Sequence, residues 1–338
     1  MKKILMIVVA GMLVMGLLAA CAKTTGPTAP EETGKIKVYG AFATQIEEPW
    51  DGVIHSALLK AQEAGKIEYS FDDAIGYKGD MERILAEVCE QEKPDVIFGD
   101  AFGNEEAVRR VAAQYPDVAF VFGSGFGPSE PNVSVFDNWI HEPAYLSGLI
   151  AGGMTKNNVI GVVGGVPVPE VNRLVNAFIA GAKKTNPEVK VLVTFINEWF
   201  NPATAKEAAL AQVDAGADVL YAERFGVIEV AAEKDLWAFG NMSDQNSLAP
   251  KNVLTGPVWN MDPTVDYVIN QVAGGTYAAQ DLKDFSMMGK GGASLADFHG
   301  NDAKIPTEIM TLVNDTLEQI KAGLFRVDID EAQPLPVN

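Results

Sequence analysis

The segment from Val159 to Pro202 constrains the fold of this chain more than any other. It holds a short apolar run at 159–163, an amphipathic stretch at 169–184 and a second apolar run at 189–196. In the middle stretch the apolar residues recur with the period of a helix. Two apolar strands joined by a helix form a βαβ unit, and such units build parallel sheets covered by helices on both faces. The segment therefore predicts an α/β fold.

The same alternation runs along most of the chain and divides into two lobes. The first half predicts strands at 35–40, 67–71, 94–99, 117–122 and 132–136, with helices at 50–64, 78–91 and 105–114 between them. A helix at 142–154 leads to strands at 159–163, 189–196, 218–221 and 236–239, with helices at 169–184, 202–215 and 226–234. Extended runs at 253–259 and 283–288 and helices at 262–273 and 305–321 complete the pattern. We expect two doubly wound parallel sheets.

The amino terminus carries a secretion signal. Lys2 and Lys3 precede an apolar run over 4–20, which is shorter than the roughly 20 residues that span a bilayer. The run ends in Leu-Ala-Ala before Cys21, which looks like a bacterial lipobox in which Cys21 is lipidated. We expect a signal peptide at 1–20 and a flexible, lipid-anchored tether at 21–34, rich in Pro, Thr and Ala. An uncleaved anchor with an incidental cysteine is the alternative.

Charge and composition argue against several functions. The formal charge of −19 is unsuited to nucleic acid or to an anionic membrane surface. The three histidines, His55, His141 and His299, lie far apart, and neither a nucleophile elbow nor a CxxC pair is present. We therefore predict no catalytic residue, no metal site and no cofactor. Cys89 is expected to be buried in a helix, and the acidic pair Glu47–Glu48 to be solvated.

Aromatic, amide and charged residues follow several predicted strands at their carboxyl ends, where open parallel sheets bind ligands. Aromatic faces would sandwich a planar ring, and an amide or carboxylate would read its edge. Each residue alone also fits a structural role, but several together favour a ligand site. The candidates are Trp50, Phe102, Asn104, Trp199, Phe200, Asn201, Arg224, Asn241 and Asp244.

Two of these residues receive specific roles. Phe200 comes just before Asn201-Pro202, where a strand gives way to a helix, so we expect its ring to project into the cleft and stack on the ligand. Trp199 is expected to point elsewhere and is the alternative stacking residue. Asp244 follows the last strand of the same lobe and is expected to accept hydrogen bonds from ring N–H or amino groups. Together they predict a stacked, edge-bound ligand.

Several motifs, in this order and spacing, resemble the basic membrane protein family, the lipoprotein substrate-binding subunits of bacterial ABC importers. They are NWIHEPAYLSG at 138–148, GVVGG at 161–165, AFIAGA at 177–182, AQVDAGAD at 211–218 and GNMSDQ at 240–245. The resemblance implies a type I periplasmic-binding-protein fold with three crossovers, placed near Asn138, Val258 and Phe285. The lobes would be 35–137 plus 259–285 and 138–258 plus 286–325, followed by a tail at 326–338.

The resemblance also implies function. A monomeric, non-enzymatic protein would capture a purine nucleobase or nucleoside and deliver it to ABC permease and ATPase subunits. An aromatic from the Trp199–Phe200 loop would pack on the base, and Asp244 would bind base or ribose. Trp259 stands where nucleoside-binding members often carry lysine, so a nucleobase such as adenine, guanine or hypoxanthine is favoured and Trp259 joins the candidate site.

Other functions remain open on the sequence alone. A sugar or autoinducer receptor has the same fold, because aromatic rings also stack on pyranoses. A lipoprotein that presents its ligand to a membrane kinase, or an adhesin, belongs to a different class. A hydrolase is the third alternative, although no nucleophile and base pair is found.

Overall fold

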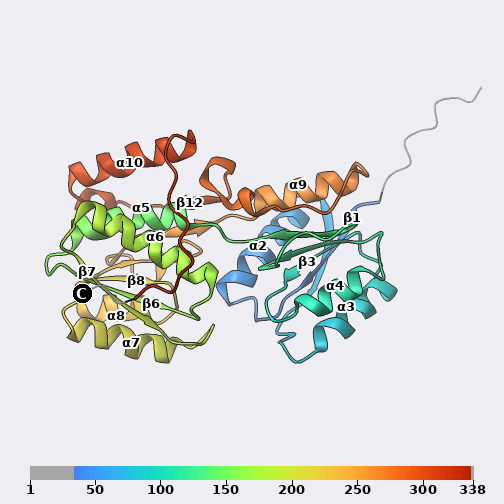
Figure 1. The fold of residues 1–338 in the computed structure, drawn as a ribbon, viewed down its shortest axis with the longest axis horizontal. Coiled ribbons are helices and arrows are strands. Elements are labelled where there is room, and N and C mark those ends of the chain that lie inside the picture. Colours follow the sequence, from blue (N-terminus) through green and yellow to red (C-terminus); the bar gives the residue numbers. More distant parts are fainter. Residues whose placement is uncertain (1–33, 336–338) are drawn as a thin grey trace, which may run out of the picture. The chain divides into compact units, whose positions relative to one another are not determined.

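The computed structural model describes residues 34–335, and the predicted signal peptide and Cys21 lie outside them (Figure 1). The first lobe contains a parallel sheet with the strand order β2-β1-β3-β4-β5. Helices connect its strands, as the sequence predicted. The elements are β1 Ile36–Ala41, α2 Pro49–Glu63, β2 Ile67–Asp72, α3 Asp80–Gln91, β3 Val96–Asp100, α4 Glu105–Ala112, β4 Ala119–Gly123 and β5 Val133–Phe136.

Apolar residues on both faces of this first sheet are buried. Val38 and Phe98 pack with Ile54 of α2, on the side also covered by α9 (Asp262–Ala273). Residues from the opposite face of the same strands, among them Ile97, pack with Leu85 of α3. Alternation of side chains along a strand places neighbours on opposite faces, so two helical layers enclose the sheet.

The second lobe repeats this plan with the strand order β10-β9-β8-β6-β7, again all parallel. Val162 and Tyr221 face a layer that includes Phe178 of α6, and Val163 and Leu220 face α7 and α8. The elements are α5 His141–Met154, β6 Val159–Gly164, α6 Pro169–Thr185, β7 Lys190–Phe195, α7 Pro202–Asp214, β8 Val219–Ala222, α8 Val227–Lys234, β9 Trp237–Phe239 and β10 Val253–Thr255. The predicted pair of doubly wound sheets is confirmed.

Helices α5 and α6 approach each other closely in the second lobe. A Cβ atom on Gly148 of α5 would lie 2.1 Å from the carbonyl oxygen of Phe178 on α6, which is far inside van der Waals contact. Only glycine allows the two backbones this distance. α10 (Thr307–Lys321) packs on the same helix α5.

Three sequence predictions need correction. The extended run at 253–259 is two strands, β10 and β11 (Pro257–Trp259), and β11 pairs antiparallel with β12 (Ala293–Leu295), which the sequence did not predict. Residues 283–288 were expected to be extended, but Lys283–Ser286 forms the 3-10 helix η2. There the backbone amide of Phe285 donates to the carbonyl of Leu282, which closes a tight turn. The hydroxyl of Ser286 donates to the carbonyl of Asp137, so the turn buries the Ser286 side chain without an extended strand.

One smaller expectation, the burial of Cys89, is met. Cys89 is buried in α3, and this burial raises the pKa of its thiol to about 11. Within residues 34–335, no helix combines the length and apolar character needed to cross a membrane.

Candidate ligand-binding site

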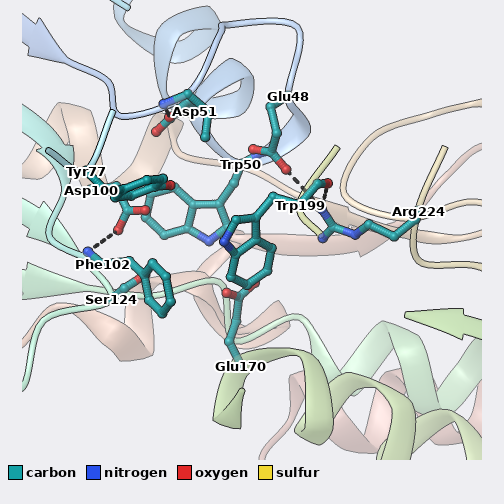
Figure 2. A pocket seen from close by; sticks show the side chains of 11 residues that line it. Glu48, Trp50, Asp51, Tyr77, Asp100, Phe102, Ser124, Glu170, Trp199 and Arg224 are labelled. Atoms are coloured by element: carbon teal, nitrogen blue, oxygen red, sulfur yellow. Dashed lines mark hydrogen bonds and ion pairs between the residues drawn. The ribbon is translucent and has the colours of Figure 1, made fainter. Parts of the chain in front are cut away.

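A pocket lies where loops at the carboxyl ends of strands from both sheets come together (Figure 2). Its cavity volume is about 30 Å³, and the wider unoccupied space around it, which includes open solvent, is about 400 Å³. Its lining combines four aromatic side chains with four carboxyls and one guanidinium. The lining residues are Thr44, Glu48, Trp50, Asp51, Tyr77, Asp100, Phe102, Ser124, Glu170, Trp199 and Arg224.

The start of α2 supplies one wall of the pocket. Glu48 caps this helix by accepting a hydrogen bond of 2.8 Å from the amide of Trp50, which fixes the first turn. The indole of Trp50 stacks on Phe136, with ring centroids 5.7 Å apart. A Cβ atom on Gly123, at the end of β4, would lie 1.8 Å from this indole. Glycine at that position therefore makes room for Trp50.

Trp199 and Arg224 supply the facing wall from the second lobe. Arg224 follows β8, and its guanidinium lies over the Trp199 ring, 5.5 Å from the centroid. Its Nη1 also donates to the carbonyl oxygen of Trp199 at 2.8 Å. Phe102, from the first lobe, meets the Trp199 ring edge-on with centroids 5.4 Å apart. Trp199 is therefore held from two sides.

Every nitrogen of the Arg224 guanidinium has a partner. Nε and Nη2 donate to the two carboxylate oxygens of Glu223 at 2.8 and 2.5 Å. Nη1 reaches across the pocket to Oε1 of Glu48 at 3.1 Å. Burial opposes the charge on Arg224, but Glu223, Glu48 and Glu170 together raise its pKa above the ordinary value. Arg224 stays charged, and four of its five N–H donors are already used by Glu223, Glu48 and the carbonyl of Trp199.

The pocket carboxyls bind protons unusually tightly. Burial raises the pKa of Asp51 to about 7 and that of Glu170 to about 8. Burial also raises the pKa of Asp100 well above its usual range, and that of Glu48 despite Arg224. A carboxyl near its pKa at neutral pH can donate or accept a hydrogen bond. The pocket can therefore bind a ligand whose edge carries both hydrogen-bond donors and hydrogen-bond acceptors.

Two buried polar atoms of the lining residues lack a hydrogen-bond partner among residues 34–335. They are the indole Nε1 of Trp50, which is a donor, and Oδ1 of Asp51, which is an acceptor while the carboxyl is ionised. The other oxygen of Asp51 accepts bonds from the backbone and hydroxyl of Thr44, at 2.9 and 2.6 Å. An unpaired buried polar group costs about 1–3 kcal/mol, so a ligand that pairs with these atoms gains affinity.

The structure brings four of the residues proposed from the sequence to this pocket: Trp50, Phe102, Trp199 and Arg224. The expected geometry of the Trp199–Phe200 pair is reversed. Asn197 turns the chain with a φ of 59°, Trp199 lines the pocket, and Phe200 is 51% exposed against Phe225. The next residue, Asn201, accepts from the amide of Thr204 and caps α7.

The remaining four proposed residues lie outside the lining of this pocket. Asn104 is buried and donates to the carbonyl of Gly76. Asn241 lies behind the pocket, where it accepts from Tyr221 and donates to Glu223. Asp244 pairs with His299 at 2.7 Å. Trp259 packs against Trp50, with centroids 5.1 Å apart, and its indole donates to Ser286.

Sequence reasoning missed most of the polar lining. Glu48 was expected to be solvated, but it is 5% exposed because it caps α2 and reaches Arg224. Asp100 ends the apolar strand β3, and its position at a strand end could have identified it as a candidate binding residue. Glu170 and Tyr77 lie on segments whose relation to the pocket depends on the packing of the lobes, so no local pattern indicated them.

Within the described ranges, no group of three His, Cys, Asp or Glu side chains is arranged to hold a metal ion. The geometry instead defines a binding protein of two α/β lobes with a ligand pocket at the strand ends. Residues 43–284 match the family of PnrA-like ABC transporter substrate-binding proteins, Bmp. The chain belongs to this family, and its resemblance to the basic membrane proteins is confirmed.

Individual relatives agree on the class but differ in their ligands. A purine-binding protein of Brucella abortus is 31% identical over 76% of this chain and 72% of its own length. A putative ABC transporter glucose-binding protein of Haloferax volcanii is 32% identical over 72% of this chain and 63% of its own length. A solved ABC transporter solute-binding protein from Aeropyrum pernix has a TM-score of 0.73 at 18% identity, over 87% of this chain and 94% of that one.

Proposed function

We propose that this protein captures a purine nucleobase or nucleoside outside the cytoplasm and delivers it to the permease and ATPase subunits of an ABC importer. The observation that carries the proposal is that two buried polar atoms of the lining, the indole donor of Trp50 and the acceptor Oδ1 of Asp51, have no partner among the described residues. Ring N–H groups and ring N or carbonyl groups on the edges of a purine can pair with such a donor and acceptor. The purine-binding relative supports the same ligand class.

Trp199 is the proposed stacking residue in place of Phe200. Its ring lines the pocket and is held by Arg224 and Phe102. We propose that ligand binding draws the lobes together, because lining residues come from both of them, with Trp50 in one and Trp199 in the other. The hinge would run through the segments near Asn138, Val258 and Phe285. The protein binds and releases its ligand unchanged, without a catalytic step.

A sugar is the second candidate. Carboxyls and a tryptophan ring also bind the hydroxyls and apolar face of a pyranose, and the glucose-binding relative is as similar to this chain as the purine-binding one. A sensory role, in which the closed form contacts a membrane kinase, would use the same pocket.

Attachment to the membrane completes the proposal. Cys21 follows Leu-Ala-Ala at the end of an apolar run, so we propose that it is lipidated and that the monomeric mature protein is tethered by 21–34. One acyl chain holds a protein only marginally, so stable anchoring requires a multiply acylated cysteine. Cys21→Ser should release the protein from membranes or leave its precursor uncleaved. Unchanged fractionation with normal processing would contradict this.

One experiment decides between the ligand classes. The purified protein is denatured, the released small molecule is identified by mass spectrometry, and its binding is remeasured by calorimetric titration. Adenine, guanine, hypoxanthine, guanosine and glucose serve as a matched panel. Purine binding with glucose inactive is the expected result. Glucose binding without purine binding would replace the purine assignment with the sugar one.

A further inference from the structure

Glu170 lies at the N-terminal end of a helix that borders the pocket, a position where the anionic group of a ligand often binds. It lies in the first turn of α6, a helix of 17 residues that begins at Pro169. The N-terminus of a helix carries a partial positive charge and free N–H groups, so it attracts phosphates and carboxylates. Here the chain's own carboxyl lines the pocket at that helix end (Figure 2).

The side chain of Glu170 is fixed from behind. The amide of Asn138 donates to its Oε1 at 2.5 Å, and Asn138 is itself fully buried. If the carboxyl swung away, one N–H of the buried Asn138 amide would lose its partner, which costs about 1–3 kcal/mol, while the amide would keep its contact with the sulfur of Met242.

The charges around Glu170 are mixed. Burial raises its pKa most, Asp137 and Glu223 raise it further, and Arg173 and Arg224 lower it. Both guanidiniums already form ion pairs, Arg173 with Asp137 at 2.7 Å and with Glu331 at 3.2 Å, and Arg224 with Glu48 and Glu223, although Nε of Arg173 has no partner among the described residues. Arg224 is the one cationic side chain among the described lining residues.

We propose that Glu170 determines the specificity of the pocket by rejecting ligands that carry an anionic group. The inference rests on the proposed function and narrows its ligand class. Uncharged bases, nucleosides or sugars enter, and amino-bearing or cationic rings are favoured. Phosphorylated forms of the same compounds are repelled once this carboxyl is ionised, so the exclusion strengthens as pH rises past about 8.

The direct test compares the binding of one nucleoside with the binding of the same nucleoside carrying a phosphate group. Dissociation constants for guanosine and guanosine 5′-monophosphate are measured by calorimetric titration at about pH 9. The wild type should bind the monophosphate at least about a hundredfold more weakly. In Glu170→Gln this ratio should fall about tenfold, because the substitution keeps the shape and removes the charge. An unchanged ratio in Glu170→Gln, or equal binding of both ligands by the wild type, would overturn the proposal.

A control and a second readout separate charge from folding. Glu308→Gln changes the same residue type in the first turn of α10, on the surface, and should keep the wild-type ratio. Because burial raises the pKa of Glu170 to about 8, the ratio should grow more in the wild type than in Glu170→Gln between about pH 7 and pH 9, where the phosphate is already doubly charged. A ratio independent of pH would count against the role of Glu170, even if the variant failed to fold.

The proposal about Glu170 can still be tested if the ligand is not a purine. Glucosamine, glucose and glucose 6-phosphate form an equivalent series in which the same order of affinities is expected. Glucose binding with guanosine inactive would remove the purine assignment and leave Glu170 tested. If neither series binds, the molecule released on denaturation decides the matter: an anionic ligand overturns the proposal, and a neutral or cationic one supports it.

Discussion

Glu48 of the first lobe and Arg224 of the second form an ion pair across the ligand pocket, with Oε1 and Nη1 3.1 Å apart. The two residues are 5% and 8% exposed, so water screens the pair little. Glu48 also caps α2, and Arg224 also holds Trp199. The contact between the lobes and the shape of the pocket therefore depend on the same two side chains.

Glu48→Gln should weaken the closed arrangement of the lobes. The substitution keeps a hydrogen-bonding oxygen at the helix cap but removes the charge that faces Arg224. We expect ligand affinity to fall about tenfold, mainly through faster dissociation, because the buried ion pair that joins the two lobes is lost while Arg224 keeps its pair with Glu223. Stopped-flow kinetics measure the rates, and small-angle scattering measures the spread of the lobes.

Glu82→Gln is the control for this variant. Glu82 pairs with Arg110 on the exposed surface of the first lobe, where solvent screens an ion pair so that it adds little to stability. Its affinity and scattering curve should match the wild type. Equal dissociation rates for Glu48→Gln and Glu82→Gln would mean that the buried pair does not hold the lobes together.

Trp199→Ala and Phe200→Ala should separate the two neighbouring aromatics. Trp199 lines the pocket, and loss of a base–aromatic stack costs about 1–3 kcal/mol, so its removal should weaken purine binding by about one to two orders of magnitude. Phe200 is half exposed against Phe225, so Phe200→Ala should bind nearly as the wild type does. Calorimetric titration of both variants provides the comparison. A larger loss of affinity in Phe200→Ala would restore the expectation drawn from the sequence.

Asp51 should make the protein less stable as pH rises. Burial raises the pKa of its carboxyl to about 7, whereas an unfolded aspartate titrates near 3.9. Between about pH 4 and pH 7 the folded protein holds a proton that the unfolded chain has lost, so the free energy of unfolding decreases with pH in that window. Thermal melting midpoints at a series of pH values should show the decline.

Asp51→Asn should flatten that dependence. Asparagine keeps an acceptor for the bonds from Thr44 and does not titrate. The variant's midpoint should change less than the wild type's between about pH 5 and pH 7.5. A dependence as steep as that of the wild type would assign the effect to other carboxyls, such as Glu170.

The sequence predicted the fold well because its signals were local. Apolar runs, helical periodicity and terminators such as Gly65 identified the alternating strands and helices of both lobes, and parallel pairing followed from the alternation. It failed at 283–288, where an apolar residue, Phe285, suggested a strand. There, burial is achieved by a short 3-10 turn whose position is set by contact with Asp137.

The site was only partly predictable. Trp50, Phe102, Trp199 and Arg224 follow strands, and the rule that ligands bind at strand ends was enough to propose them. Which of two adjacent aromatics faces the pocket depends on one left-handed residue, Asn197, and no pattern in the loop predicts that turn. The acidic character of the lining was missed because Glu48 was expected to be solvated and because the packing around Glu170 cannot be read from its neighbours in the sequence.

Arg173 should contribute far more to stability than its partner in the carboxyl-terminal segment. It is 2% exposed, and its guanidinium pairs with Asp137 at 2.7 Å, beside Asn138, where the chain passes from β5 into α5. Arg173→Met should leave Asp137 partly buried and unpaired, which costs about 3–5 kcal/mol. Glu331, 45% exposed at its side chain, makes the outer contact of Arg173 at 3.2 Å, so Glu331→Gln should cost about 1 kcal/mol or less. Denaturant unfolding of both variants measures the difference. Losses of similar size would show that the outer contact, and not the pair at Asp137, accounts for the stabilisation by Arg173.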